Sequence, residues 1–133
     1  MEQKNALKKP VISSATLDKK ETRQPFSAIG QSLIIHEWRG SGPDYLHVHY
    51  EDDEAWYVLE GTLTFKFSDG IVDAPEGTTV FVPAGVPHTY FIKDFARYLI
   101  ILTPRLNELI SELQASPYDK HSLIMKKYKS EIL

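Results

Sequence analysis

Between residues 30 and 103 the sequence is divided into short apolar or alternating runs, and this division restricts the fold more than any other feature. Clusters of glycine, proline and aspartate separate the runs, as expected for short strands joined by tight turns. Asp69-Gly70 predicts a β-hairpin, because both residue types tolerate a positive φ. Many short strands with close turns favour a sandwich or a barrel. The predicted strands cover Leu33–Trp38, Leu46–His49, Ala55–Leu59, Leu63–Phe67, Thr78–Val82, His88–Ile92 and Tyr98–Leu102.

The 133 residues divide into three zones, and this length is enough for one domain with its own hydrophobic core. Residues 1–28 are polar and charge-rich, so we predict a partly ordered N-terminal arm. Residues 29–103 hold the predicted strands. Residues 104–133 are predicted to form a helical tail that packs on the barrel or on a partner subunit.

The first helix of this tail has a clear start. Thr103 is a suitable N-cap, and Pro104 follows at the first helical position, where its missing N–H costs nothing. Leucine and isoleucine then recur at helical spacing until Ser116-Pro117. A second helix is predicted from about Asp119. Its buried side is expected to carry Leu123, Ile124 and Tyr128.

Composition and charge exclude several classes of partner. The formal net charge of −3 gives no support for nucleic acid or an anionic membrane as the partner. The sequence lacks the roughly 18 consecutive apolar residues that would span a bilayer, and we expect no secretory signal. The absence of cysteine excludes disulfides, thiolate ligands and a cysteine nucleophile. We therefore expect a cytoplasmic protein.

A cluster of potential metal ligands lies inside the strand region. His47 and His49 point to the same face of a strand, with Cα atoms about 6.6 Å apart. Two imidazoles at that spacing can reach one metal ion at about 2.1 Å. If the acidic loop 50–53 closes a hairpin, Glu54 stands opposite His49 and its carboxylate joins the same face. On this register the face also carries Tyr45, Trp56 and Val58.

The opposite face of this predicted hairpin is apolar as well. A hairpin that is apolar on both sides must be covered on both. One cover is the barrel interior, and the other is a partner sheet, the N-terminal arm or a second subunit. We expect a homodimer partly for this reason. The residues of this second face are Leu46, Val48, Ala55, Tyr57 and Leu59.

A third histidine, His88, follows a second predicted hairpin, in which the tight turn Pro83–Pro87 comes after the run Thr78–Val82. No local feature of the sequence places His88 beside His47 and His49, so closure of the site depends on the fold. Three imidazoles and a carboxylate left unpaired in an apolar interior would cost on the order of several kcal/mol. Either a metal ion or a full hydrogen-bond network must compensate for this cost.

The remaining polar residues have simpler interpretations. His36 and His121 lack a partner at ligand spacing, so we interpret both as hydrogen-bonded structural residues. Asp52 and Asp53 are interpreted as solvated loop charges.

These residues resemble the two motifs of the cupin superfamily, usually written G-x5-H-x-H-x(3,4)-E-x6-G and G-x5-P-x-G-x2-H-x3-N. The first motif has Ser41 in place of its leading glycine, and the second has Ile92 in place of its final asparagine. The tail that begins at Leu102-Thr103-Pro104 is similar to small single-domain cupins resembling quercetin dioxygenases. The motifs read His47-x-His49-x4-Glu54-x6-Gly61 and Gly77-x5-Pro83-x-Gly85-x2-His88.

The resemblance implies a mainly β fold: a double-stranded β-helix, or jelly-roll barrel, with two short C-terminal α-helices. It also implies one divalent transition-metal ion per chain. Mixed histidine and glutamate ligands suit iron, manganese, nickel, copper or zinc. The implied ligands are His47, His49, Glu54 and His88, and neither departure from the motifs touches them.

The predicted site suits an enzyme, although the fold does not select the reaction. Four protein ligands on a six-coordinate ion leave two positions open for substrate and O₂. We expect Tyr45, Trp56 and Tyr90 to form an aromatic wall that binds a small-molecule substrate. Glu54 is expected to act as ligand and, if it swings off the metal, as general base. The first hypothesis is a quercetinase-type dioxygenase that acts on a small aromatic or enol-containing substrate.

Two alternatives stay open. The first is a metal-dependent isomerase or epimerase of a sugar or keto acid, in which the metal polarises a carbonyl. The second is a non-catalytic cupin that binds a small molecule.

Overall fold

The computed structural model describes residues 9–13 and 24–133. In this part of the chain the backbone forms nine strands, all paired antiparallel, with helices only after the eighth strand. The strands are β1 (Ser27–Ile29), β2 (Ile34–Trp38), β3 (His47–His49), β4 (Glu54–Phe67), β5 (Gly70–Pro75), β6 (Thr79–Val82), β7 (His88–Phe91), β8 (Ala96–Leu102) and β9 (Ser130–Ile132). The helices are α1 (Pro104–Gln114), the 3-10 turn η1 (Tyr118–Lys120) and α2 (His121–Lys127).

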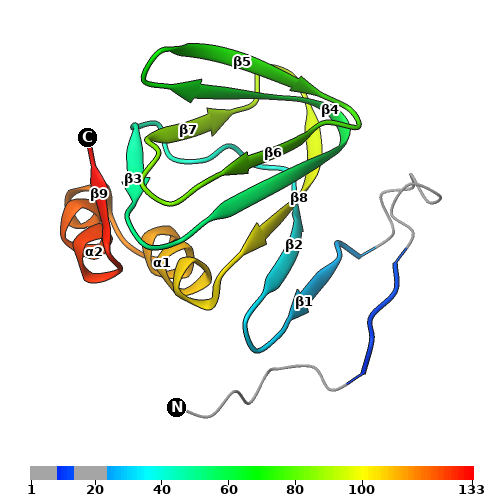
Figure 1. Cartoon of the computed structure of the whole chain (residues 1–133), viewed down its shortest axis with the longest axis horizontal. Coiled ribbons are helices and arrows are strands. Elements are labelled where there is room, and N and C mark those ends of the chain that lie inside the picture. The colour runs from blue at the N-terminus through cyan, green and yellow to red at the C-terminus, as the bar shows by residue number, and fades with distance from the viewer. Residues whose placement is uncertain (1–8, 14–23) are drawn as a thin grey trace.

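The strands form the two sheets of a jelly-roll barrel, as predicted (Figure 1). One sheet has the order β1-β2-β8-β4-β6, and the other has the order β5-β4-β7-β3-β9. Strand β4 belongs to both sheets because it is 14 residues long. Its first half pairs with β6 and β8, and its second half pairs with β5 and β7.

The sequence predicted two separate strands where β4 runs continuously. The register of β4 against β8 shifts between Val58 and Glu60, and Gly61 follows with φ of 73°. A bulge of this kind bends a strand without ending it, and glycine adopts the left-handed φ at little cost. The glycine that looked like a strand break is therefore the point at which one strand passes from the first sheet to the second.

Two of the three predicted hairpins are wrong. Strand β3 does not pair with β4, because the start of β4 pairs with β6 in the first sheet, while β3 pairs with β7 and β9 in the second. For the same reason β6 does not pair with β7. Loops 50–53 and 83–87 therefore cross between sheets. The hairpin at Asp69-Gly70 is confirmed, with Phe67 paired to Gly70.

The hydrophobic core fills the barrel and extends under the first helix. Large side chains from both halves of β4 pack against those of β8 inside the barrel, and α1 contributes leucine side chains to the same core. Burying such side chains is the main favourable term in folding, at about 25 cal/mol per Å² of apolar surface. The most completely buried members are Trp56, Val58, Leu63, Tyr98, Ile100, Leu106 and Leu109.

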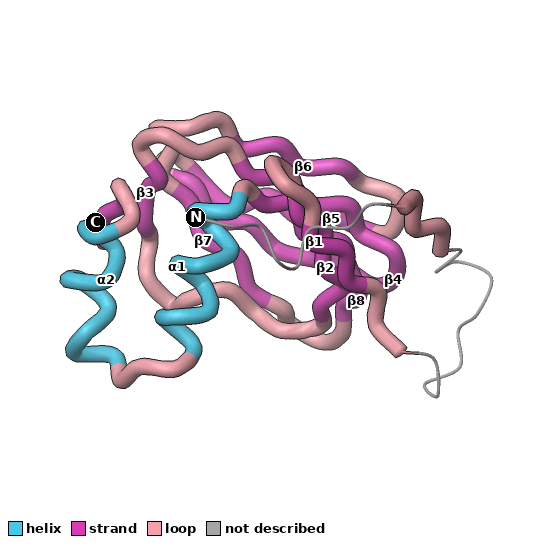
Figure 2. Tube along the Cα trace, turned by 90° about the horizontal axis from the view of Figure 1, so that it is seen from below, coloured by secondary structure: helices cyan, strands magenta, loops and turns pink. Residues whose placement is uncertain are grey.

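The helices lie together at one end of the barrel, beside β3 and β9 (Figures 1 and 2). The predicted start of α1 is confirmed, because the Thr103 side chain accepts a hydrogen bond of 3.2 Å from the Leu106 N–H. On α2 the buried residues are Ile124 and Met125, so the prediction that Leu123 is buried is wrong: its side chain is 73% exposed.

Three of the strands are not predicted from the sequence. Strand β1 spans the boundary that was placed at residue 28/29, and it pairs with β2. Strand β5 follows the Asp69-Gly70 turn. Strand β9 follows α2 through Lys129, which has φ of 59°, although the tail was expected to be entirely helical. Of the predicted N-terminal arm, residues 1–8 and 14–23 lie outside the described part.

The outer face of the first sheet is apolar along a row that crosses its strands. Ile35 pairs with Ile101, Ile101 pairs with Ala55, and Ala55 pairs with Phe81. Phe81 is 61% exposed, and the neighbouring Tyr57 is 36% exposed. This row therefore presents hydrophobic side chains to the outside of the chain.

No helix among the described residues is long and apolar enough to cross a lipid bilayer.

The bulge in β4 provides a test of the fold. Replacing Gly61 by alanine would place a Cβ 2.0 Å from the Phe95 carbonyl oxygen at a φ of 73°. We expect Gly61→Ala to lower the free energy of unfolding by about 3 kcal/mol or more, measured by urea denaturation. The control is Gly77→Ala, where φ is 85° but no atom lies within 4 Å of the added Cβ. That variant should lose only about 1–2 kcal/mol, and equal losses would contradict the steric explanation.

Candidate metal centre

Three buried histidines meet where β3 and β7 lie side by side. His47 and His49 share one face of β3 because they are two residues apart, and His47 is paired directly with His88 of β7. All three side chains are at most 4% exposed. Each offers a ring nitrogen, and these nitrogens lie within 4.8 Å of one another. Three histidines predicted from two separated motifs therefore form a cluster that could bind a metal ion.

The outward ring nitrogens of two of these histidines are held by backbone carbonyls. His47 Nδ1 lies 3.2 Å from the Tyr45 carbonyl oxygen, and His88 Nδ1 lies 2.9 Å from that of Val86. A carbonyl only accepts hydrogen bonds, so each Nδ1 carries the proton and donates it. Each Nε2 is then left with a lone pair that faces the centre of the cluster. Neutral imidazole in this form is a metal ligand.

Glu54 joins the histidines by a route that the sequence did not predict. It enters from the start of β4 in the opposite sheet, and its Oε1 lies 3.1 Å from His88 Nε2 and 3.3 Å from His49 Nε2. Two donor atoms that bind one ion at about 2.1 Å lie roughly 3 Å apart. The Glu54 carboxylate, which is only 5% exposed, therefore lies at the spacing of a further ligand from two of the three histidines.

The protonation pattern requires a positive charge at this point. His88 Nε2 meets the Glu54 carboxylate oxygen at 3.1 Å, and this contact is favourable only if a proton or a metal cation lies between the two atoms. His49 Nε2 is buried and has no hydrogen-bond partner among the described residues. A buried acceptor without a partner is costly. A divalent cation between these atoms would satisfy all of them, so the residues fit a metal ion.

Burial and mutual proximity set the charge states of His47 and Glu54. Burial, followed by the nearby His88 and His49, lowers the pKa of His47 to about 3, so its imidazole is neutral at pH 7. Burial alone would raise the pKa of Glu54, but the contacts with His49 and His88 outweigh it and bring the pKa to about 2. Glu54 is therefore ionised. A neutral imidazole and an ionised carboxylate are the forms that bind a cation.

A cavity of about 590 Å³ opens beside this cluster. His47, His49 and Glu54 line its inner part, and α1 and α2 form its wall on the helical side. Tyr45 and Tyr90 line it as predicted. Trp56 does not: it is fully buried and packs edge-on against His88, with ring centroids 5.9 Å apart. The helical wall is made by Leu109, Ile110, Leu113, Gln114, His121 and Met125.

Both remaining histidines are hydrogen-bonded, as predicted, but one of them also reaches the cavity. His36 contacts Ser27 Oγ and Asn107 Oδ1. His121 Nε2 lies 3.0 Å from the Leu113 carbonyl oxygen, so its Nδ1 accepts from the Tyr45 hydroxyl at 2.8 Å. No local spacing places His121 in the cavity wall, because this position results from how α2 packs against the barrel.

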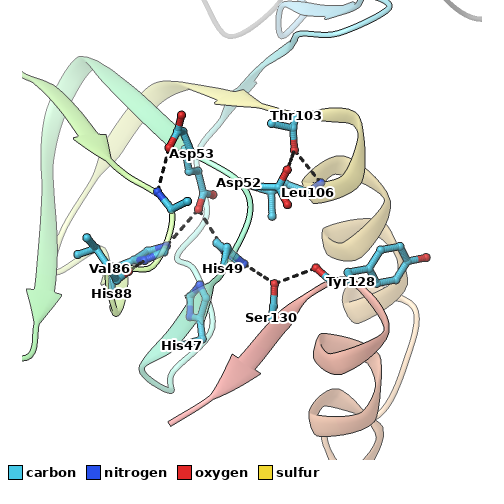
Figure 3. Close-up of polar contacts among 12 residues, drawn as sticks. His47, His49, Asp52, Asp53, Val86, His88, Thr103, Leu106, Tyr128 and Ser130 are labelled. Carbon is cyan, nitrogen blue, oxygen red and sulfur yellow. Dashed lines mark hydrogen bonds and ion pairs between the residues drawn. The ribbon is translucent and has the colours of Figure 1, made fainter.

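The interpretation of Asp52 as a solvated charge is wrong. Its carboxylate is buried, with Oδ2 2.8 Å from Arg105 Nε and Oδ1 2.9 Å from Thr103 Oγ1. These contacts join the loop before Glu54 to the start of α1. Asp53 is exposed and accepts a hydrogen bond of 2.9 Å from the Ala84 N–H. Figure 3 shows Asp52 beside Thr103 at the start of α1, and Asp53 on the other side, bonded to the loop that leads to His88.

Comparison with known proteins gives a family and a set of similar folds. The model of the cupin domain family matches residues 35–102, whereas no curated protein matches the chain. A crystal structure of a Neisseria meningitidis protein is 25% identical, with a TM-score of 0.51, over 63% of this chain and 87% of that chain. A cupin-2 domain containing protein from Shewanella frigidimarina is 26% identical, with a TM-score of 0.52, over 65% and 84%.

A third structure carries a functional name. A sugar phosphate isomerase of the cupin superfamily from Silicibacter pomeroyi is 25% identical, with a TM-score of 0.50. The similarity covers 56% of this chain and 52% of that chain, so about half of the isomerase has no counterpart in the match.

Metal binding is tested by changing one imidazole. We expect protein purified without added metal and then titrated with zinc to bind about one ion per chain, and His47→Ala to bind at least tenfold more weakly, because one ligand is lost. Isothermal titration calorimetry measures both affinities. His36→Ala is the matched control, since His36 lies outside the cluster and should leave zinc affinity unchanged. A His47→Ala affinity equal to that of the unmodified protein would contradict the site.

Proposed function

The chain belongs to the cupin domain family, and on that premise we propose that it is a metal-dependent oxygenase of quercetinase type acting on a small aromatic or enol-containing substrate. The proposal rests on one observation: a cavity of about 590 Å³, walled mainly by apolar and aromatic side chains, ends at three of the four proposed ligands. Small-molecule sites typically measure about 300–1,000 Å³ and combine an apolar wall with a few converging polar groups.

The proposed ligands are His47, His49, Glu54 and His88, with one divalent ion per chain. When bound, such an ion supplies a Lewis acid that stabilises negative charge on a substrate oxygen, with dioxygen as co-substrate. Three neutral imidazoles and one carboxylate leave a net charge of +1 on the centre. This charge favours a substrate that brings an anionic or enolic oxygen.

The protein residues position the substrate and receive its proton. Glu54 is ionised, is buried from bulk solvent and is one of the residues that line the cavity. It is therefore placed to accept the proton of a substrate hydroxyl that enters beside it. Tyr45 and Tyr90 contribute ring faces and edges to the cavity, where an aromatic substrate can stack. The leucine and isoleucine side chains of α1 make one wall of the same space apolar.

The similarity to a sugar phosphate isomerase favours a second candidate, in which the metal polarises a carbonyl without any redox change. The composition of the cavity wall speaks against a sugar phosphate. Among the described residues that line the cavity, Arg39 is the only lysine or arginine, and sugar hydroxyls need many polar partners. Leu109, Ile110, Leu113 and Met125 offer none. We therefore rank the oxygenase first.

Oxygen consumption separates the two candidates. We expect protein loaded with iron, manganese or nickel to consume O₂ with at least one member of a set of flavonols, catechols and diketones, measured with an oxygen electrode. Ile110→Trp should lower kcat/KM about tenfold or more, because the added bulk takes up cavity space, while metal content stays unchanged.

The matched control for this experiment is Leu123→Trp, which adds the same side chain on α2 at a position that is 73% exposed and outside the cavity. It should retain the kcat/KM of the unmodified protein. Turnover of a sugar or keto acid under strictly anaerobic conditions, with no O₂ consumption on any substrate of the set, would replace the oxygenase by the isomerase.

We further propose that the chain forms a homodimer through the outer face of the first sheet. The apolar row of Ile35, Ile101, Ala55 and Phe81 supports this proposal, since large exposed apolar patches mark interaction surfaces. Light scattering should give twice the chain mass, and Phe81→Glu should shift the protein to the monomer. Ile71→Glu, at a position of 61% exposure on β5 in the other sheet, is the control. A monomeric unmodified chain would contradict the proposal.

A further inference from the structure

The last strand of the chain is paired directly with the strand that carries two of the proposed ligands. Along β3 and β9, His47 pairs with Ile132 and His49 pairs with Ser130. Backbone hydrogen bonds extend the pairing at both ends, from Leu133 N to the Leu46 carbonyl and from Tyr50 N to the Lys129 carbonyl, both 2.9 Å long. Strand β9 lies well beyond residues 35–102, which match the cupin domain model. A segment outside the matched domain therefore supports the metal centre.

Ser130 contacts a proposed ligand through its side chain. Its hydroxyl is buried, at 3% exposure. It donates a hydrogen bond of 3.2 Å to the Tyr128 carbonyl oxygen, which leaves its oxygen free to accept. His49 Nδ1 lies 2.8 Å from that oxygen and is the donor. Figure 3 shows this series of contacts from His49 through Ser130 to Tyr128.

The hydroxyl of Ser130 thus does for His49 what backbone carbonyls do for the other two histidines. His47 and His88 donate to carbonyls two residues earlier in the chain, at Tyr45 and Val86. The partner of His49 is 81 residues away. With its proton held on Nδ1, His49 turns the lone pair of Nε2 toward Glu54, where it has no hydrogen-bond partner among the described residues.

We propose that Ser130 is a positioning residue of the metal centre, fixing the tautomer and ring orientation of His49 so that Nε2 is presented to the ion. This inference rests on the proposed metal site. An outer partner of a ligating histidine orients the ring and raises the basicity of the ligating nitrogen, and its loss typically weakens metal binding about 10–100-fold. The C-terminal segment is then a part of the site rather than only a cover for the barrel.

A purely structural role for Ser130 predicts something different. Strand β9 is attached to β3 by backbone hydrogen bonds and by the side-chain bond of 2.6 Å from the Tyr50 hydroxyl to Glu131. Neither involves the Ser130 hydroxyl. If β9 only braces β3, any change that loosens the strand should affect metal binding, and loss of the hydroxyl alone should not.

The experiment compares three variants of the full chain. Each is stripped of metal with a chelator and titrated with cobalt(II), and affinity and the d–d absorption spectrum are recorded together. Ser130→Ala removes the hydroxyl and should bind cobalt about 10–100-fold more weakly, with a changed spectrum. Ser130→Thr keeps the hydroxyl and should remain within about threefold of the unmodified chain. Glu131→Ala loosens the same strand at an exposed contact and should keep both affinity and spectrum.

The possible results distinguish the two proposals. An affinity and spectrum of Ser130→Ala equal to those of the unmodified chain would overturn the role of Ser130 and leave the metal site standing. Equal losses in all three variants would assign the effect to strand packing and would also overturn it. If the unmodified chain binds no cobalt, the proposed metal centre fails, and the role of Ser130 fails with it.

Discussion

The candidate centre depends on one constraint: the buried acceptor atoms of three histidines and one carboxylate face one another at short distances. The Nδ1–H groups of His47 and His88 donate hydrogen bonds to backbone carbonyls, so the Nε2 atoms of both rings point inward. The carboxylate of Glu54 lies against two of the three imidazoles. An apolar interior does not tolerate such a group of acceptors without a compensating positive charge. A metal cation would supply that charge, and the pairing of the surrounding strands holds the acceptors together.

The two sheets hold this group from opposite sides. Strands β3 and β7 are neighbours in one sheet, and their pairing sets His47 directly beside His88. Glu54 arrives in the other sheet, at the start of β4. The carboxylate and the imidazoles therefore meet across the barrel rather than along one hairpin. The bulge near Gly61 allows β4 to belong to both sheets, so the strand that delivers the carboxylate also pairs, through its second half, with the strand that carries His88.

Residues beyond the matched cupin domain complete the site. Helices α1 and α2 form one wall of the cavity that ends at the ligands, and β9 supplies the hydroxyl that contacts His49. The start of α1 is tied to the loop before Glu54 through the contacts of Asp52 with Thr103 and Arg105. The apolar character of the cavity is therefore a property of the tail as much as of the barrel.

The sequence by itself determined what alternation and motif spacing can determine: a mainly β fold, most of its strands, the N-cap at Thr103, and the pair of His47 and His49. That His88 meets this pair was implied by the motif resemblance and was decided by the pairing of β3 with β7. Period-two alternation is a local property, so it placed His47 and His49 on one face of β3 without knowledge of their neighbours. Only the tertiary structure decided which strands pair. Loops 50–53 and 83–87 look like hairpin turns but cross between sheets, and the helical pattern of the tail concealed β9. Pairing partners are chosen by contacts between residues far apart in the chain, which no short window of sequence contains; the link from His49 to Ser130, across 81 residues, is such a contact.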